Sequence, residues 1–138
     1  ADLDWLRAKI DAGASEAITQ FFFDAETFLR FRDRAAAAGV AAPIIPGILP
    51  IEDWAKTSKF AEACGAIIPD ELRAAFDVAV RDDRADLLAI AQAAELADTL
   101  VCEGCDHLHF YTLNRPELTR DVCTALGLAP RPSLSRVA

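Results

Sequence analysis

Polar side chains gather in the stretch HLHFYTLNRPEL, residues 107–118, directly after an apolar run and around a proline that can start a helix. Among them, the guanidinium of Arg115 is suited to bidentate binding of a carboxylate or a phosphate. An ordinary salt bridge to an Asp or Glu is the competing interpretation. If residues 107–113 form a strand, Tyr111 and Arg115 mark the strand end at which parallel α/β proteins collect functional groups.

Two other residues are placed to contact a flat ligand. Gln20 lies in the run ITQFFF, residues 18–23, which is apolar on both faces apart from Thr19 and Gln20, as in a parallel strand covered by helices. A buried amide can bond the donor and acceptor edge of a heterocycle, and neighbouring backbone groups can satisfy it equally well. Phe60, on a predicted helix near the strand ends, can stack on such a ligand, although core packing is the commoner role of a lone phenylalanine.

Four possible metal ligands follow one another in the pattern CxxCxHxH: Cys102, Cys105, His107 and His109. Cysteine and histidine bind zinc, so a metal-binding module is one alternative function. The spacing argues against it, because a strand over residues 107–113 points both histidines to one face while the cysteines precede that strand. A redox CxxC is equally disfavoured, since the thioredoxin type follows a strand and opens a helix. We therefore predict no metal site.

Hydrophobic periodicity and capping residues predict the elements that must position these groups. Helical spacing from Leu3 stops at Gly13, Asp24 caps a second helix, and Pro116 opens the last one. Strands that alternate with helices predict a parallel α/β sheet. In residue numbers, the predicted order is helix 3–12, strand 16–24, helix 25–39, a proline-containing strand within 40–54 with a turn at 46–50, helices 52–64, 69–79 and 82–101, strand 107–113, helix 116–126 and a polar terminus at 129–138.

Composition restricts the class of protein. The chain has 138 residues, the length of one domain, with 53% hydrophobic residues and a mean hydropathy of +0.19. We expect part of this apolar surface to lie against another chain or a further part of this one. A net charge of −8 without a basic stripe argues against nucleic-acid binding, and the apolar runs are too short for a membrane span. The start of the chain does not read as a secretory signal, and we expect a cytoplasmic protein with reduced cysteines.

Three segments together resemble the C-terminal half of methylenetetrahydrofolate reductases, in the same order and at similar spacings: residues 18–40, 43–51 and 108–119. The resemblance runs over about residues 2–127. It implies that residues 1–138 are part of a (β/α)8 TIM barrel, namely its last three parallel strands with their helices. It also implies FAD as the cofactor and NADH or NADPH as the reductant, with hydride passed to 5,10-methylenetetrahydrofolate to form 5-methyltetrahydrofolate.

The same resemblance assigns roles to residues of this chain. It implies contacts to FAD from Asp2 and Lys9, and contacts to the folate or nicotinamide from Gln20, Phe60, Leu113 and Arg115. Lys56 stands where relatives carry a neutral glutamine, and the CEGCDH segment at 102–107 replaces one without paired cysteines. The family's general acid, a glutamate on the first strand, has no counterpart here. The resemblance therefore implies no catalytic residue in this chain and no turnover by it alone.

Open sheet edges raise the question of partners. Three parallel strands leave two edges that can pair with other strands. We expect a small folate ligand together with either a homo-oligomer or association with the missing half of the barrel. The alternative is a non-catalytic fragment whose copies associate through those edges.

Overall fold

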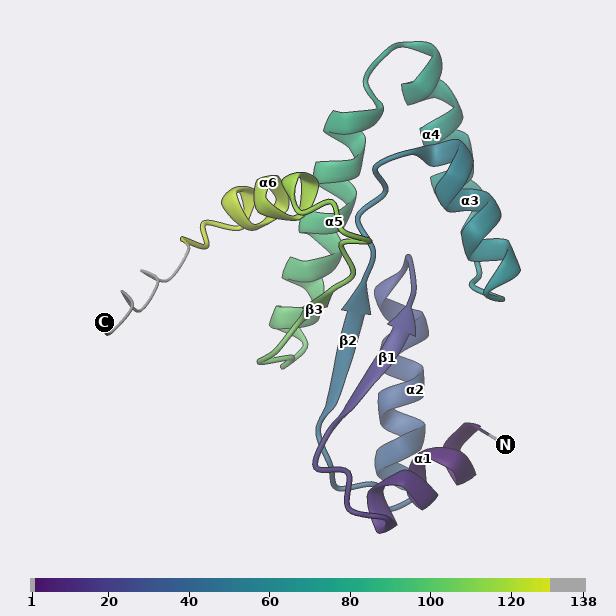
Figure 1. Cartoon of the computed structure of the whole chain (residues 1–138), viewed down its shortest axis with the longest axis vertical. Coiled ribbons are helices and arrows are strands. Elements are labelled where there is room, and N and C mark those ends of the chain that lie inside the picture. The colour runs from purple at the N-terminus through teal and green to yellow at the C-terminus, as the bar shows by residue number, and fades with distance from the viewer. Residues whose placement is uncertain (1, 130–138) are drawn as a thin grey trace.

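The computed structural model describes residues 2–129, and Figure 1 shows its three strands and six helices. Each of the nine predicted elements is present with its predicted type. The predicted polar terminus lies outside the described residues apart from Ala129. In chain order the elements are α1 (Asp2–Asp11), β1 (Ala17–Phe21), α2 (Ala25–Ala37), β2 (Ile44–Ile48), α3 (Trp54–Ala63), α4 (Asp70–Arg81), α5 (Ala85–Cys102), β3 (His109–Phe110) and α6 (Glu117–Ala125).

Two strands differ in extent from the prediction. β3 has only two residues, whereas seven were predicted. It is short because the chain turns soon afterwards: Leu113 and Asn114 have φ of 48° and 65°, in the left-handed region that ends an extended strand. The predicted turn at 46–50 is also wrong in its first half, since Pro46 and Gly47 belong to strand β2.

The sheet is parallel with the strand order β1–β2–β3, so β2 is the central strand. A proline in a central strand cannot donate to the ladder and is tolerated mainly at a bulge. Such an irregularity is present: Ile18 pairs with Ile45 and Phe21 with Gly47, so three steps along β1 match two along β2. Pro46 lies between Ile45 and Gly47, at the position of this irregularity.

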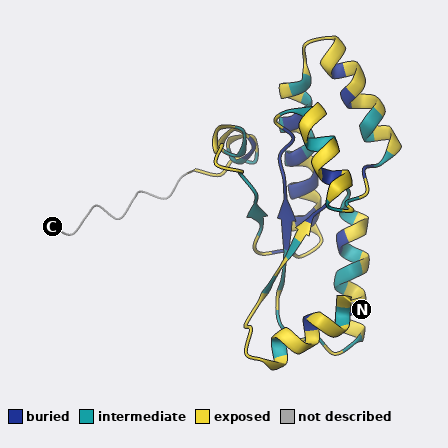
Figure 2. Cartoon of the chain, turned by 45° about the vertical axis from the view of Figure 1, so that its right-hand side comes forward, coloured by how far each residue is buried: buried dark blue, intermediate teal, exposed yellow. Residues whose placement is uncertain are grey.

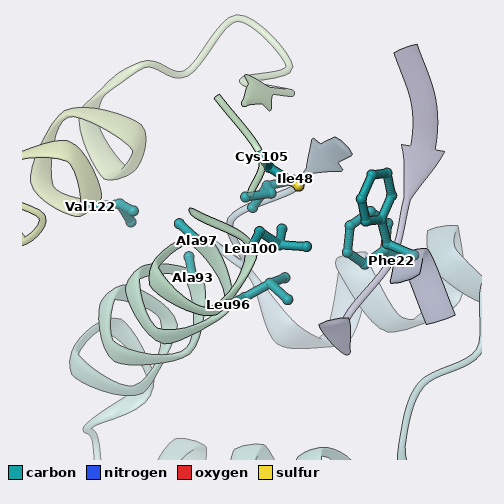
Figure 3. Packing of buried hydrophobic residues seen from close by; sticks show 9 residues of the cluster. Phe22, Ile48, Ala93, Leu96, Ala97, Leu100, Cys105 and Val122 are labelled. Atoms are coloured by element: carbon teal, nitrogen blue, oxygen red, sulfur yellow. The ribbon is translucent and has the colours of Figure 1, made fainter. Parts of the chain in front are cut away.

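One face of the sheet is covered by α2, α5 and α6, and Figure 1 views the sheet from the other face, with the strands in front of α2 and α5. Between sheet and helices lies a continuous apolar core, which we call the helix-side cluster (Figure 3). Leu100 of α5 and Val122 of α6 have no exposed surface at all, and Phe28 of α2 is 2% exposed. The buried members are Phe22, Phe28, Ile48, Ala93, Leu96, Ala97, Leu100, Cys105 and Val122.

A second apolar cluster lies at the carboxyl ends of the strands, under α3 and α4. It joins Phe21 and Leu49 from the strand ends to Phe76 of α4. The indole of Trp54 stacks on Phe76 with ring centroids 4.8 Å apart, and its Nε1 donates to Asp77 Oδ1 at 2.9 Å. These contacts hold the α3–α4 pair above the sheet, as the upper part of Figure 1 shows.

Burial differs between the two longer strands, and the prediction of two-sided burial is wrong for β1. Ile48 of the central strand β2 is buried, whereas Ile18 of β1 is 49% exposed and Gln20 is also exposed. Figure 2 shows the same contrast, with β2 mostly dark blue and β1 partly yellow. The physical reason is position in the sheet: β1 is an edge strand of the described chain, so one side of it has no neighbour there. An α/β fold with three parallel strands and six helices is consistent with part of a TIM barrel. Within residues 2–129, none of the helices combines the length and apolarity that crossing a membrane requires.

Candidate functional site

A pocket of about 190 Å³ lies at the carboxyl ends of β2 and β3, and we call it the strand-end pocket. Its lining includes Glu52, which follows β2, Lys56 on the first turn of α3, and Leu113 and Arg115, which follow β3. Because the carboxyl ends of parallel strands meet at one edge, side chains distant in sequence converge there. The predicted site residues Leu113 and Arg115 thus share one pocket, and Lys56 is their neighbour. Their role as ligand contacts stays a prediction.

Both cations of the strand-end pocket are paired with carboxylates. Arg115 Nη1 donates to Glu52 Oε1 at 3.1 Å, and Lys56 Nζ lies 3.2 Å from Asp53 Oδ2. The salt bridge that competed with ligand binding in the interpretation of Arg115 is therefore present. Exposed pairs of this kind contribute only about 0.2–1 kcal/mol, so a ligand carboxylate or phosphate can replace either partner at small cost.

Asp53 has a second function at this pocket, as the N-cap of α3. Its Oδ1 accepts a hydrogen bond from the backbone N–H of Lys56 at 3.0 Å, which is the capping geometry. This backbone bond, and then the Lys56 side chain, lower the pKa of Asp53 below its ordinary value. The carboxylate therefore stays ionised and fixes the first turn of α3, on which Lys56 stands.

The turn after β3 holds Leu113 in an unusual conformation. Leucine rarely adopts a positive φ, and the value of 48° at Leu113 is followed by 65° at Asn114, a residue that tolerates this region better. The N–H of Arg115 closes the turn by donating to the carbonyl of Thr112 at 2.8 Å. As a result Leu113 is 64% exposed at the pocket instead of packing into the core. Backbone strain of this kind is common at binding sites.

Phe60 combines the two roles that the sequence left open. It stands on α3 with one side of its ring stacked on Phe21, at a centroid distance of 5.6 Å and an interplanar angle of 26°. It nevertheless remains 43% exposed, which leaves ring surface free for a flat ligand. Phe21 also meets Tyr111 of the strand-end pocket edge to face at 6.2 Å. A row of three aromatic rings thus connects Phe60 to that pocket.

Gln20 lies at the open edge of β1, in a cavity of about 460 Å³ that also reaches Phe28 of α2 and Ile67 beyond α3. It is exposed, contrary to the expectation of a glutamine inside a buried strand. Its Oε1 accepts from the N–H of Phe21 at 3.1 Å, so a neighbouring backbone group does satisfy the acceptor. The amide nevertheless faces a cavity, as a ligand contact would.

The two predicted cofactor contacts lie on α1. Asp2 and Lys9 are both exposed and line one cavity of about 550 Å³ between α1 and the start of β1. Seven residues separate them, roughly 10 Å along the helix axis. Asp2 also lines the cavity of Gln20. Among the described residues, the pair on α1 is separate from the strand-end pocket, so the six predicted site residues do not form one closed site.

Comparison with known proteins decides the family. The family model of methylenetetrahydrofolate reductase matches residues 1–127. The chain belongs to the methylenetetrahydrofolate reductase family. The 5,10-methylenetetrahydrofolate reductase of Escherichia coli (strain K12) is 45% identical over 133 residues, which cover 94% of this chain and 44% of that protein.

Other relatives show the same partial coverage. The 5,10-methylenetetrahydrofolate reductase of Pectobacterium carotovorum is 44% identical over 131 residues, and 44% of its length is covered. Methylenetetrahydrofolate reductase (NADH) 1 of Arabidopsis thaliana is 34% identical over 137 residues, which are 99% of this chain and 23% of that protein. The chain therefore spans less than half the length of these methylenetetrahydrofolate reductases.

For a member of this reductase family, the metal-binding alternative finds no support. Within residues 2–129, no three His, Cys, Asp or Glu side chains come close enough together to hold a metal ion. The two cysteines are separated by environment: Cys102 is exposed at the end of α5, and Cys105 is buried in the helix-side cluster (Figure 3). Burial raises the pKa of the Cys105 thiol, which disfavours the thiolate that metals bind. His109 instead lies edge-on against Tyr111 at 4.7 Å.

Three residues near the candidate site were not predicted as members of it from sequence: Thr19, Gly47 and the partner of Arg115, Glu52. The Tyr111 hydroxyl donates to the Thr19 carbonyl at 2.8 Å, and the Gly47 N–H donates to Thr19 Oγ1 at 3.0 Å. One signal was available, since a glycine inside a strand often marks a close approach of another group. The identity of that group was not readable, because Thr19 and Tyr111 are 92 residues apart.

Proposed function

We propose that this chain forms one side of the catalytic barrel of a flavin-dependent methylenetetrahydrofolate reductase, the side that contacts the folate and the nicotinamide. In the proposed reaction, NADH or NADPH reduces a bound flavin, and 5,10-methylenetetrahydrofolate is reduced to 5-methyltetrahydrofolate. The residues that bind these ligands are Gln20, Phe60, Leu113 and Arg115. The proposal places the general acid outside the 138 residues, so we expect no turnover by them alone.

One observation carries this proposal: the row of aromatic rings Phe60, Phe21 and Tyr111 ends at the strand-end pocket. An exposed ring and an exposed guanidinium are thereby held at the same end of the sheet. A pterin or nicotinamide requires a stacking surface, and a folate also carries carboxylates, which Arg115 can bind once Glu52 is displaced. Lys56 supplies a second cation at that pocket.

The residues of α1 fit the proposed flavin cofactor by their chemistry. Lys9 offers an ammonium for a diphosphate and Asp2 a carboxylate for ribose hydroxyls, and both face one cavity. Bound FAD would supply the hydride chemistry, as cofactors do in such enzymes. The part of this chain is to hold the nucleotide end through Lys9 and Asp2 and to orient the substrate through Gln20 and Phe60.

Completion of the barrel is part of the same proposal. The two edge strands, β1 and β3, are each paired on one side only within the described chain, and Ile18 of β1 is 49% exposed. A barrel closes such edges with further strands. We propose that strands like those in the remaining length of the relatives pair with β1 and β3. Self-association of this chain through the same edges is the alternative, and exposed Ile18 is the observation that favours it.

Reconstitution tests these proposals together. The chain is mixed with the N-terminal part of the Escherichia coli relative, namely the part that it does not match, and the mixture is separated by size in the presence of FAD. We expect a one-to-one complex that retains flavin absorbance and oxidises NADH with a folate acceptor, while the chain alone does neither. An Arg115→Ala chain should form the complex but use folate poorly.

Two contrary outcomes can be told apart, one against the reductase function and one in favour of self-association. A complex without flavin or activity would overturn the reductase function while keeping the association. A chain that forms only dimers or larger assemblies of itself, with or without the other part, would instead support self-association through the sheet edges.

A further inference from the structure

A single side chain directly after the last strand reaches the first strand across the central one. The hydroxyl of Tyr111 donates to the carbonyl of Thr19 at 2.8 Å, although the strand order is β1–β2–β3. Tyr111 is itself attached to β2, because its N–H donates to the carbonyl of Ile48 at 2.8 Å. One residue therefore contacts all three strands at their carboxyl ends.

The central strand makes room for this crossing at Gly47. A Cβ atom there would lie 2.5 Å from the Thr19 carbonyl oxygen and 2.7 Å from Tyr111 Cε2, both far inside contact distance. The φ of Gly47 is not positive, so its requirement is space and not backbone conformation. The Gly47 N–H donates to Thr19 Oγ1, which secures the same residue of β1 from a second direction.

The Thr19 carbonyl is available to Tyr111 because of the bulge in β1. The irregularity places Thr19 and Gln20 between the paired residues Ile18 and Phe21, and the Gly47 N–H that faces this segment donates to Thr19 Oγ1 instead of to the carbonyl. A buried or half-buried carbonyl without a donor is costly, so the tyrosine hydroxyl replaces the missing ladder bond. The next residues of β1 are Gln20, which faces the proposed ligands, and Phe21, which stacks on Phe60.

We infer that Tyr111 is a positioning residue, which fixes the end of β1 and thereby sets Gln20 and, through Phe21, the ring of Phe60. It acts by its hydroxyl on Thr19 and by its edge-to-face contact with Phe21 at 6.2 Å. Phe21 in turn stacks on Phe60 at 5.6 Å. This inference rests on the proposed function for the identity of the ligands, but the positioning itself concerns only residues of this chain.

The test compares two variants that each remove one aromatic hydrogen-bond donor. Tyr111→Phe deletes the hydroxyl and keeps the ring. Trp54→Phe is the matched control, because it deletes the Nε1–H that donates to Asp77 at 2.9 Å and lies in the α3–α4 pair instead of the sheet. Both variants and the parent chain are labelled with ¹⁵N and ¹³C. The carbonyl shift of Thr19, the amide shifts of Gln20 and Phe21, and the ring signals of Phe60 are then recorded, followed by a thermal melt. An NADH titration is made on each chain after reconstitution with the N-terminal part of the Escherichia coli relative and FAD.

We expect Tyr111→Phe to move the signals of Thr19, Gln20, Phe21 and Phe60 and to weaken NADH binding by up to about tenfold. Trp54→Phe should lower the melting temperature about as much as Tyr111→Phe does, without moving the Thr19 and Gln20 signals or changing the NADH affinity. Unchanged Thr19 and Gln20 signals in Tyr111→Phe, or equal movement in Trp54→Phe, would overturn the inference. A reconstituted parent complex that does not bind NADH counts against the proposed function, and the shift comparison still decides the role of Tyr111.

Discussion

The helix-side cluster and the strand-end pocket lie on the same three strands but differ in almost every physical property. The cluster is apolar and closed, with Leu100 and Val122 fully buried. The pocket is lined by exposed ion pairs and by Leu113, which is 64% exposed on a left-handed backbone. The helix-side cluster stabilises the fold by excluding water from apolar surface, whereas the strand-end pocket keeps its polar groups available to a ligand.

This difference separates substitutions that affect folding from those that affect binding. In the cluster, loss of a methyl group leaves a cavity that neighbours fill poorly. In the pocket, loss of a charged side chain should change stability little, because exposed ion pairs contribute little to it. Gly47 and Tyr111 lie between the two regions and are expected to affect both. Four predictions, in order of decreasing effect, test this separation.

Leu100→Ala is expected to produce the largest loss of stability. Leu100 is completely buried under the sheet, so its truncation should lower the free energy of unfolding by about 2–5 kcal/mol. Val101→Ala is the matched control on the same helix, since Val101 is 54% exposed and its truncation should change stability by less than about 0.5 kcal/mol. Urea unfolding followed by circular dichroism measures both. Equal effects in the two variants would contradict the described helix packing.

Gly47→Ala is expected to be the most harmful change of a single methyl group. The added Cβ would meet the Thr19 carbonyl at 2.5 Å and Tyr111 Cε2 at 2.7 Å, and the first of these is backbone that cannot rotate away. Overpacking of this kind costs about 1–3 kcal/mol, and here it should also separate β1 from β2. Urea unfolding and amide exchange at Phe21 provide the measurement. A variant as stable as the parent chain would show that the strands are further apart than described.

Arg115→Ala is expected to affect ligand binding and spare the fold. Removal of the guanidinium should weaken binding of 5-methyltetrahydrofolate by about tenfold, because charge-assisted bonds to its carboxylate are lost. Stability should change by less than about 1 kcal/mol, since the pair with Glu52 is exposed. Arg81→Ala is the control, because Arg81 forms a similar exposed pair with Asp82 at 3.0 Å on α4. Equal folate affinity in both variants, measured by titration calorimetry, would remove Arg115 from the site.

Asp53→Asn is expected to have the smallest effect of the four on stability. The effect is recognised by its dependence on pH. The folded pKa of Asp53 lies below the ordinary value of 3.8, first because of the Lys56 N–H and then because of its side chain. The ionised form therefore stabilises the fold at pH above the unfolded pKa, and this contribution is lost as pH falls through the folded pKa. The stability difference between the chain and the variant should be constant near neutral pH and disappear as the pH falls through the folded pKa of Asp53. A difference that grows on acidification would contradict the cap.

Much of the fold could be predicted from the sequence because its signals are local. Gly13, Asp24 and Pro116 mark helix boundaries by their own conformational preferences and side-chain bonds, and the structure places them there. The length of β3 could not be read, because the hydrophobic run continues to Leu113, beyond the end of β3 at Phe110. The exposure of Gln20 could not be read either, since hydrophobicity reports what a strand can bury and not whether a neighbour is present.

For the candidate site too, some features follow from the sequence and others only from the tertiary structure. By itself the sequence determined the helices, the parallel strands and the residue types at the strand ends, since periodicity, capping and chain direction depend on near neighbours. Only the tertiary structure decided that Arg115 pairs with Glu52, that Phe60 stacks on Phe21, and that Tyr111 reaches Thr19 over Gly47. Each of these contacts joins residues far apart in the chain, so it depends on strand order and on a bulge of a single residue, which no local pattern encodes.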